Sequence, residues 1–334
     1  MKIAFFSTQK TDRKNFCEQS LPGVEWTFFE VHLMPKTKAL VSGFDAVCVF
    51  VNDCLNREVL QAVKAANISL ILFRCAGFNN LDVAAAKELG LTVLRVPAYS
   101  PMAVAEHALA LMFALNRKTH KAYNRVREGN FSIEGLLGFD FYQKTAGVIG
   151  TGRIGLQLIR MLRGLNMRVL AYDIVPNAQA KEMGAEYVDL PTLYQQSDMI
   201  SLHVPLTEET KYLIDAQALE QMKSGVMLIN TSRGALIDTR AVIKAIKTRK
   251  VGYLGIDVYE QEESLFFEDH SEEIIEDDVF ERLLTFPNVL VTAHQGFYTR
   301  EAITHIRQTT FDNIAAFQQG QILTENCIVC PSSL

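Results

Sequence analysis

Short apolar runs alternate with helix-period segments along most of this 334-residue chain. Four runs in its first hundred residues have the length and composition of buried strands: 2–7, 44–51, 68–77 and 91–97. Helix-like segments at 56–67 and 80–90 lie between the later ones. Parallel strands need long crossover connections, which are usually helices. The alternation therefore predicts an α/β fold built on parallel sheets.

A second series of strand-like runs begins at Thr145, after a long helix predicted over 101–130. Its members are 145–150, 168–173, 198–205, 225–232, 253–259 and 288–294, enough for a complete doubly wound sheet. A last helix, predicted over 299–320, should return to the first series. We therefore expect two domains, one made of 1–100 and 299–334 and the other of 101–298, as the chain length also favours.

Composition excludes several classes of protein. A net charge of −5 without a lysine or arginine cluster disfavours nucleic acids and anionic membranes as partners. No apolar run approaches the roughly 20 residues that span a bilayer, and the amino terminus lacks a cleavage signature. The scattered cysteines are typical of reduced thiols in the cytoplasm. Cys327 and Cys330 have C-x-x-C spacing but no second pair or histidine nearby, so we expect no metal or redox site there.

The segment 259–281 is strongly acidic. Eleven of its residues are aspartate or glutamate, interrupted by Leu265, Phe266 and Phe267. Unpaired charges stay in water because burying them is costly. We therefore interpret most of this segment as a solvated surface loop.

The turn from Gly150 to Gly155 has the spacing G-x-G-x-x-G, with Gly152 in the middle and Arg153 and Ile154 before the last glycine. It follows an apolar strand and opens an amphipathic helix, which is the context the motif requires. The first glycine permits a tight turn, the second lets a pyrophosphate approach the backbone, and the third lets helix pack on strand. The helix amino terminus adds the positive end of a dipole. Together they predict a dinucleotide site.

Asp173 ends the next strand, eighteen residues past Gly155. A carboxylate at that position accepts hydrogen bonds from the adenosine ribose hydroxyls. It also repels a 2′-phosphate, and no arginine follows in 174–179 to counter it. This pattern favours NAD over NADP. The alternative is that Asp173 is an ordinary turn residue at a strand end.

Three polar residues stand at or just past the carboxyl ends of later strands: Arg233, Glu262 and His294. Such ends converge on one edge of a parallel sheet, where the cofactor also lies. Arginine binds a carboxylate bidentately, histidine exchanges a proton near neutral pH, and a neighbouring carboxylate stabilises imidazolium. Each residue alone is more often an ordinary ion-pairing or buried group. Together they indicate the reduction of a 2-oxo acid.

These motifs, in this order, resemble those of the NAD-dependent D-2-hydroxyacid dehydrogenases, and most of all the fermentative D-lactate dehydrogenase branch. The matching stretches are GVIGTGRIG, NTSRGALID, GIDVYEQE and TAHQGF, joined by RCAGFNNLD, RVPAYSPMAVAEHAL and SLHVPLTEET. The resemblance covers nearly the whole chain. It implies a Rossmann NAD-binding domain inserted into a flavodoxin-like substrate domain, with hinges near residues 100 and 298. It also implies a homodimer or homotetramer in which the helix after Pro101 joins subunits.

The same resemblance implies roles for individual residues. Arg233 would bind the substrate carboxylate and carbonyl, His294 would be the acid/base, and Glu262 would be its carboxylate partner. Further substrate contacts are implied for Ala76, Gly77, Tyr99 and Phe297. The cofactor cleft would be lined by His203, Val204, Pro205 and Thr231, with Asp257 shaping the nicotinamide region.

Three hypotheses about function follow. The leading one is NADH-dependent reduction of pyruvate to D-lactate and the reverse reaction. A second keeps this chemistry but changes the substrate to a bulkier 2-oxo acid, branched or aromatic. A third is an NADH-sensing scaffold that binds a protein partner without turnover. The complete set of Arg233, Glu262 and His294 disfavours the scaffold, because a pure binder needs no proton donor.

Overall fold

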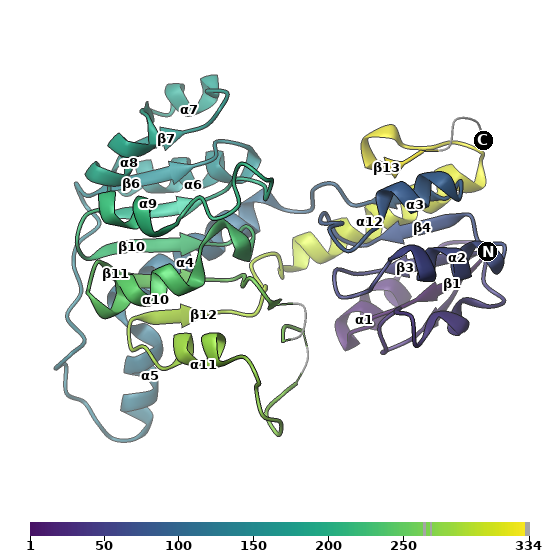
Figure 1. The fold of residues 1–334 in the computed structure, drawn as a ribbon, viewed down its shortest axis with the longest axis horizontal. Helices are drawn as coiled ribbons and strands as arrows, with labels where there is room; N and C mark the ends of the chain where they lie inside the picture. Colours follow the sequence, from purple (N-terminus) through teal and green to yellow (C-terminus); the bar gives the residue numbers. More distant parts are fainter. Residues whose placement is uncertain (263–264, 268, 331–334) are drawn as a thin grey trace. The chain divides into compact units, whose positions relative to one another are not determined.

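The computed structural model describes residues 1–262, 265–267 and 269–330, and the chain divides into two compact units (Figure 1). Unit 1 contains Met1–Ser100 together with the chain from Tyr298 onward. Unit 2 contains Pro101–Phe297. The first and last parts of the sequence, purple to blue and yellow in Figure 1, therefore belong to the same unit.

Unit 1 is built on one sheet with the strand order β13-β5-β4-β3-β1-β2. The strands are β1 (Lys2–Phe5), β2 (Glu25–Phe28), β3 (Ala46–Val49), β4 (Leu70–Phe73), β5 (Thr92–Arg95) and β13 (Cys327–Val329). They pair in parallel except at β13, which runs antiparallel to β5. The order β2-β1-β3-β4-β5 is that of the flavodoxin-like doubly wound fold, so the predicted fold class of this unit is confirmed.

Unit 2 is built on a parallel sheet with the strand order β12-β11-β10-β9-β6-β7-β8. The strands are β6 (Thr145–Ile149), β7 (Arg168–Tyr172), β8 (Glu186–Tyr187), β9 (Met199–Leu202), β10 (Val226–Asn230), β11 (Val251–Ile256) and β12 (Val289–Val291). The order reverses between β6 and β9, which is the topological switch point of a Rossmann sheet. Ligands bind such sheets at that point, outside the carboxyl ends of the strands.

Helices cover the sheets of both units (Figure 1). Unit 1 contains α1 (Lys10–Glu18), α2 (Arg57–Ala65), α3 (Val83–Glu88), α12 (Arg300–Gln318) and the 3-10 turns η1 (Lys38–Val41) and η4 (Thr324–Asn326). Unit 2 contains α4 (Pro101–Arg117), α5 (Thr119–Arg127), α6 (Arg153–Gly164), α7 (Ala178–Glu182), α8 (Leu190–Gln196), α9 (Ala216–Gln221), η2 (Gly234–Leu236), α10 (Thr239–Lys247) and α11 (Asp278–Leu284). Several start at a side-chain cap: Asn56, for example, accepts the amide hydrogen of Val59 at the start of α2.

Each sheet is buried on both faces. Successive strand residues point to opposite sides, so neighbours in sequence enter different cores. In β10, Leu228 lies in the core packed by α9 and α10, while Met227 and Ile229 lie in the core packed by α4 and α6. This two-sided burial explains why the strands read as continuous apolar runs rather than alternating ones.

Three strands were not predicted from the sequence: β2, β8 and β13. Each ends a sheet or is very short, and β2 alternates exposed with half-buried residues. Edge strands lack a neighbour on one side, so they need no continuous apolar run. The pairing of these edge strands depends on the strands beside them, namely β1, β7 and β5.

The predicted helix over 101–130 is wrong in one respect, because it is interrupted at Lys118. This residue has a left-handed backbone (φ +50°) and separates α4 from α5. Asn116 lies at the end of α4 and makes two hydrogen bonds to the backbone of Phe139. Its side-chain nitrogen donates to the carbonyl oxygen of Phe139, and its side-chain oxygen accepts the amide hydrogen of Phe139. A loop far along the chain thus fixes where the helix turns, and no local pattern encodes that.

The cysteines also depart from expectation at the C-terminal end. Cys48 and Cys75 are buried, as the sequence suggested. Cys327 and Cys330, however, are joined by a disulfide, with Cα atoms 6.0 Å apart. The pair follows from the short edge strand β13, whose end brings the two side chains together. Among the residues that the structure describes, no helix is both long and apolar enough to cross a membrane.

Candidate active site

The glycine turn after β6 has the geometry that each of its glycines requires. Gly150 has φ +95°, and a Cβ there would lie 2.4 Å from the carbonyl oxygen of His203. A Cβ on Gly155 would lie 2.0 Å from the carbonyl oxygen of Gly150. At Gly152, by contrast, a Cβ would meet no atom within 4 Å. Two glycines therefore serve the packing of the turn, while Gly152 leaves open space for a ligand to approach the backbone.

The first turn of α6 is available to an anion. Gly152 is its N-cap residue and supplies no side-chain cap, so the following amides, from Arg153 and Ile154 onward, are not capped by a side chain. Asp173, just after β7, lies beside the same turn. Its Oδ2 atom accepts hydrogen bonds from the amide of Thr151 at 2.6 Å and from the Thr151 hydroxyl at 3.0 Å. Asp173 is therefore fixed next to the glycine turn, as a ribose-binding carboxylate must be.

The strands on the other side of the switch point supply the remaining cleft residues. His203, Val204 and Pro205 follow β9, and the carbonyl group of His203 packs against Gly150. Burial of the His203 ring lowers its pKa to about 4, so this histidine is neutral near pH 7. Thr231 follows β10 and is buried. Its hydroxyl oxygen finds no hydrogen-bond partner in the part of the chain that the structure describes, as expected of a group that awaits a ligand.

Glu262 and His294 form a hydrogen-bonded ion pair. The Nδ1 atom of His294 lies 2.8 Å from Oε1 of Glu262, and both side chains are about four-fifths buried, with 17% and 20% of their surfaces exposed. The other carboxylate oxygen accepts the amide hydrogen of Tyr259 at 2.9 Å, which orients Glu262. Because the carboxylate accepts a hydrogen bond from Nδ1–H, the Nε2 atom is the one left to exchange a proton with a substrate.

Arg233 lies on a turn that packs on the segment leading to Glu262. It follows β10, and its carbonyl oxygen accepts a hydrogen bond from Asn230 at 2.8 Å. A Cβ on the next residue, Gly234, would lie 2.0 Å from the carbonyl carbon of Tyr259. Only glycine allows this contact. The strands that precede Arg233, Glu262 and His294, namely β10, β11 and β12, are also neighbours in the sheet.

The turn that carries His294 is held by a buried aspartate. Asp257, 1% exposed, accepts the amide hydrogens of Gln295 at 2.9 Å and Gly296 at 2.8 Å, and the hydroxyl of Thr292 at 2.5 Å. His107, from α4, contacts the same group: its Nε2 atom lies 3.2 Å from Oδ1 of Asp257. The carboxylate of Asp257 thus shapes the loop itself. Its predicted effect on the nicotinamide region stays a prediction.

Part of the acidic segment 259–281 packs into the core of unit 2 or caps a helix there. The expectation of a mostly solvated loop is corrected to that extent. Phe266 is buried in the core beside α10 and α11. The ring of Phe267 lies 5.7 Å from the ring of His294. Asp277 caps α11 and accepts the hydroxyl of Tyr259 at 2.7 Å. Glu263, Ser264 and Glu268 lie outside the described residues.

The other predicted substrate residues lie at or near strand ends. Ala76 and Gly77 follow β4 in unit 1, where the carbonyl oxygen of Ala76 accepts a hydrogen bond from Arg95 at 2.9 Å. Tyr99 precedes the end of the first segment of that unit. Phe297 is the last residue of unit 2, three past His294. Their contacts with a substrate stay predictions.

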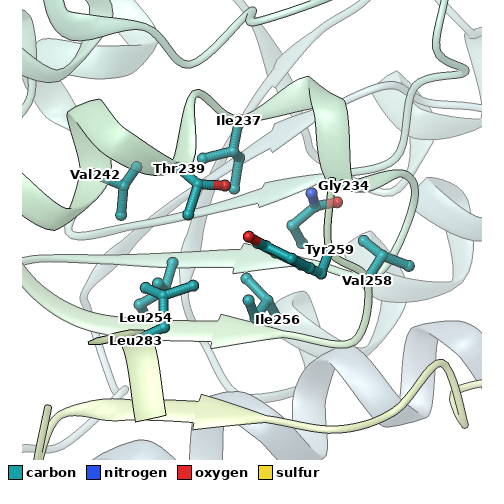
Figure 2. A pocket seen from close by; sticks show the side chains of 10 residues that line it. Gly234, Ile237, Thr239, Val242, Leu254, Ile256, Val258, Tyr259 and Leu283 are labelled. Atoms are coloured by element: carbon teal, nitrogen blue, oxygen red, sulfur yellow. The ribbon is translucent and has the colours of Figure 1, made fainter. Parts of the chain in front are cut away.

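A small apolar cavity is lined by Gly234, the residue that follows Arg233, and by side chains of β11 and α10 (Figure 2). Figure 2 shows it between the side chains of Ile237, Leu254, Ile256 and Tyr259. Its lining is almost wholly apolar, and Arg233, Glu262 and His294 are not part of it. We therefore regard it as a packing gap between sheet and helices and not as the place of the chemistry.

Comparison with known proteins agrees with this geometry. Residues 109–296 match the family model described as "D-isomer specific 2-hydroxyacid dehydrogenase, NAD binding domain". The chain belongs to the D-isomer specific 2-hydroxyacid dehydrogenase family. As a member of this family it is an NAD-dependent oxidoreductase, and the predicted family, enzyme class and cofactor are confirmed.

Three relatives of this dehydrogenase illustrate its place in the family. The D-lactate dehydrogenase of Escherichia coli (strain K12) is 53% identical over the full length of both chains, and its apo structure superposes with a TM-score of 0.90 at 52% identity, covering 98% of this chain and 100% of that one. The D-lactate dehydrogenase from Aquifex aeolicus, complexed with NAD and lactic acid, gives 0.86 at 33% identity and coverages of 99% and 100%. A D-2-hydroxyisocaproate dehydrogenase gives 0.84 at 31% identity and coverages of 97% and 98%.

The residues of this dehydrogenase fit the NAD that its family binds. The pyrophosphate would be held by the open backbone at Gly152 and the α6 amino terminus. The fixed Asp173 carboxylate would hold the adenosine ribose, and the buried Thr231 hydroxyl would hold the nicotinamide ribose or amide. Sequence reasoning assigned no role to His107 or Phe267. A histidine in an alanine- and leucine-rich helix, and phenylalanines in an acidic run, were the signals that could have drawn attention to them.

Proposed function

We propose that this dehydrogenase reduces pyruvate to D-lactate with NADH and catalyses the reverse reaction. The observation that carries the proposal is the partly buried pair of Glu262 and His294, whose geometry leaves Nε2 of the histidine for a substrate. Similarity to D-lactate dehydrogenases along the full chain supports the choice of substrate.

His294, Glu262 and Arg233 have separate roles in the proposed reaction. Bound NADH supplies the hydride that reduces the carbonyl carbon of the 2-oxo acid. His294 donates the proton from Nε2 to the carbonyl oxygen, because an alkoxide is too basic to form freely near neutral pH. Glu262 accepts a hydrogen bond from Nδ1 and so holds the ring in place. Arg233 binds the substrate carboxylate bidentately and polarises the carbonyl. Pyruvate, NADH and one proton thus give D-lactate and NAD.

We assign the domains accordingly. Cofactor binding belongs to the segment 101–298 and substrate binding to 1–100 with 299–334, including Ala76, Gly77 and Tyr99, while Phe297 adds to the substrate pocket. The compact units support this assignment, although the structure groups Tyr298 with unit 1.

We further propose that the protein is a homodimer or homotetramer. Large apolar side chains are exposed on α5, which lies within the stretch 101–130 where the family resemblance puts a subunit contact, and on the segment after it. They are Tyr123, Val126, Phe131, Ile133 and Leu137, with exposures of 52% to 86%. A monomer rarely leaves such a group in water. Light scattering with size-exclusion chromatography will show whether the mass is a multiple of 37.5 kDa.

The proposed setting is the cytoplasm, where reduction of pyruvate would regenerate NAD during fermentation. The buried free thiol of Cys48 supports that compartment, and the Cys327–Cys330 disulfide does not. Cell fractionation tests the location directly.

The deciding experiment compares kcat/KM for pyruvate, a branched and an aromatic 2-oxo acid, and determines the chirality of each product. Pyruvate should have the highest value and should give the D isomer. A higher value for the branched or aromatic acid would favour the activity named in the D-2-hydroxyisocaproate dehydrogenase relative. In the same assay, His294→Ala should lose most turnover while still binding NADH, since the glycine turn and Asp173 hold the cofactor.

A further inference from the structure

The catalytic histidine occupies a backbone conformation that must be held from outside. His294 has φ +51°, in the left-handed region, which is unfavourable for a residue other than glycine. The strand before it, β12, has only three residues, so the sheet anchors the turn weakly. Whatever fixes this turn also fixes where Nε2 of His294 points.

Asp257 binds the turn on both sides of the histidine. Its carbonyl oxygen accepts the amide hydrogen of His294 at 2.7 Å. Its carboxylate oxygens accept the amide hydrogens of Gln295 and Gly296, one each, and the hydroxyl of Thr292. The carboxylate is almost fully buried, and a buried charge must be matched by donors that stay in place.

His107 completes this set of donors. Its Nε2 atom lies 2.9 Å from the Thr292 hydroxyl oxygen and 3.2 Å from Oδ1 of Asp257. The Thr292 hydroxyl has one hydrogen, and that hydrogen goes to Asp257. Towards His107 the oxygen can therefore only accept, so Nε2 of His107 must carry a hydrogen. That hydrogen points at Thr292 and Asp257 together.

We propose that His107 is a positioning residue of the reaction. Through Asp257 and Thr292 it holds the left-handed turn of His294, so a side chain on α4 determines the direction of the catalytic imidazole. The packing supports this role: a Cβ on Gly296 would lie 2.9 Å from Oδ2 of Asp257 and 3.3 Å from a ring carbon of His107. The turn, the carboxylate and the α4 histidine thus form one close-packed unit. The inference rests on the proposed function, in which His294 supplies the proton.

The test compares His107→Leu, which removes the donor, with His107→Gln, whose amide nitrogen can replace Nε2–H at similar reach. In His107→Leu we expect kcat to fall roughly ten- to a hundred-fold, since small misplacements of a catalytic group cost this much. The dissociation constant for NADH should change less than about twofold, because the pyrophosphate and the adenosine ribose are held at the glycine turn and Asp173. His107→Gln should recover most of the loss. Removal of the exposed histidine on α12, His305→Leu, is the matched control and should leave kcat unchanged.

A second readout does not depend on turnover. Amide hydrogen exchange of Gln295 and Gly296 should accelerate in His107→Leu and return towards the wild-type rate in His107→Gln. If kcat and exchange both stay at wild-type values in His107→Leu, the proposal is wrong. It is equally wrong if exchange accelerates all along α4, or if glutamine restores nothing. A wild-type protein that reduces no 2-oxo acid would refute the proposed function instead. The exchange measurement would still test whether His107 holds the turn through Asp257 and Thr292.

Discussion

The Nδ1 atom of His294 lies 2.8 Å from Oε1 of Glu262, although 32 residues separate the two in the chain. The carboxylate accepts a hydrogen bond from Nδ1–H and so fixes the orientation of the ring, which leaves Nε2 for a substrate. The position of Nε2 should therefore depend on Glu262.

Replacing Glu262 with glutamine should lower turnover. Glu262→Gln keeps the shape but loses the charge that strengthens the hydrogen bond to Nδ1 of His294. A hydrogen bond to a charged group is worth about 1.5–3 kcal/mol, so kcat for pyruvate reduction should fall by roughly ten-fold or more. NADH titration is the control for cofactor binding and should change little. Glu260→Gln, a neighbouring carboxylate that binds the amide of Thr239 instead, should leave kcat unchanged; an equal loss in both variants would show that Glu262 has no special role.

Cofactor preference should depend on Asp173. The wild-type enzyme should strongly prefer NADH to NADPH. Asp173→Asn keeps a polar group near Thr151 but loses the charge, so NADH use should weaken by roughly ten-fold or more while NADPH improves. Steady-state kinetics with both cofactors measure this. Equal use of both by the wild type would show that Asp173 does not contact the ribose.

Substrate binding should depend on the planar fork of Arg233. Lysine keeps the charge but cannot bind a carboxylate bidentately. Loss of one such contact is worth a few kcal/mol, so Arg233→Lys should lower kcat/KM for pyruvate by roughly two to three powers of ten. NADH titration serves as the control and should change little. Unaltered kinetics would place the carboxylate site elsewhere.

The aromatic ring of Phe267 should help to hold the His294 ring. The two ring centroids lie 5.7 Å apart, within the range of aromatic contacts. Phe267→Ala removes this contact, so we expect a several-fold lower kcat, with Phe267→Tyr close to wild type. NADH titration should show unchanged cofactor binding. A wild-type kcat in the alanine variant would contradict this role.

Acid should destabilise the protein through His203. Burial lowers the pKa of this histidine to about 4, below the ordinary value of 6.5 in the unfolded chain. Between these values the unfolded state binds more protons, so the free energy of unfolding falls as pH decreases. Because the ring is only partly enclosed, we expect a loss on the order of 1 kcal/mol from about pH 7 to about pH 5. Urea unfolding without cofactor should show a smaller loss in His203→Gln than in wild type or in His305→Gln. Identical losses in all three would exclude this origin.

The sequence by itself determined those features of the protein that depend only on residues close together in the chain. The α/β class, the glycine turn and the place of Asp173 follow from local patterns, because strand, turn and helix each constrain residues only a few positions apart. His294 and Glu262 were also found this way, since both follow apolar strands. Arg233 was found in the same way, and the glycine turn with Asp173 favoured NAD. In each of these cases the residue type and its local context carried the inference, while the family motifs added the individual roles of residues such as Tyr99 and Phe297.

Only the tertiary structure decided which distant groups touch. The break at Lys118 follows from a loop that binds Asn116, and the burial of Phe266 follows from helices packed around it. The contact of His107 with Asp257 joins positions 150 residues apart, on a helix and after a strand. Such contacts depend on strand order and helix packing, because hydrogen bonds and burial act between neighbours in space and leave no periodic trace along the chain.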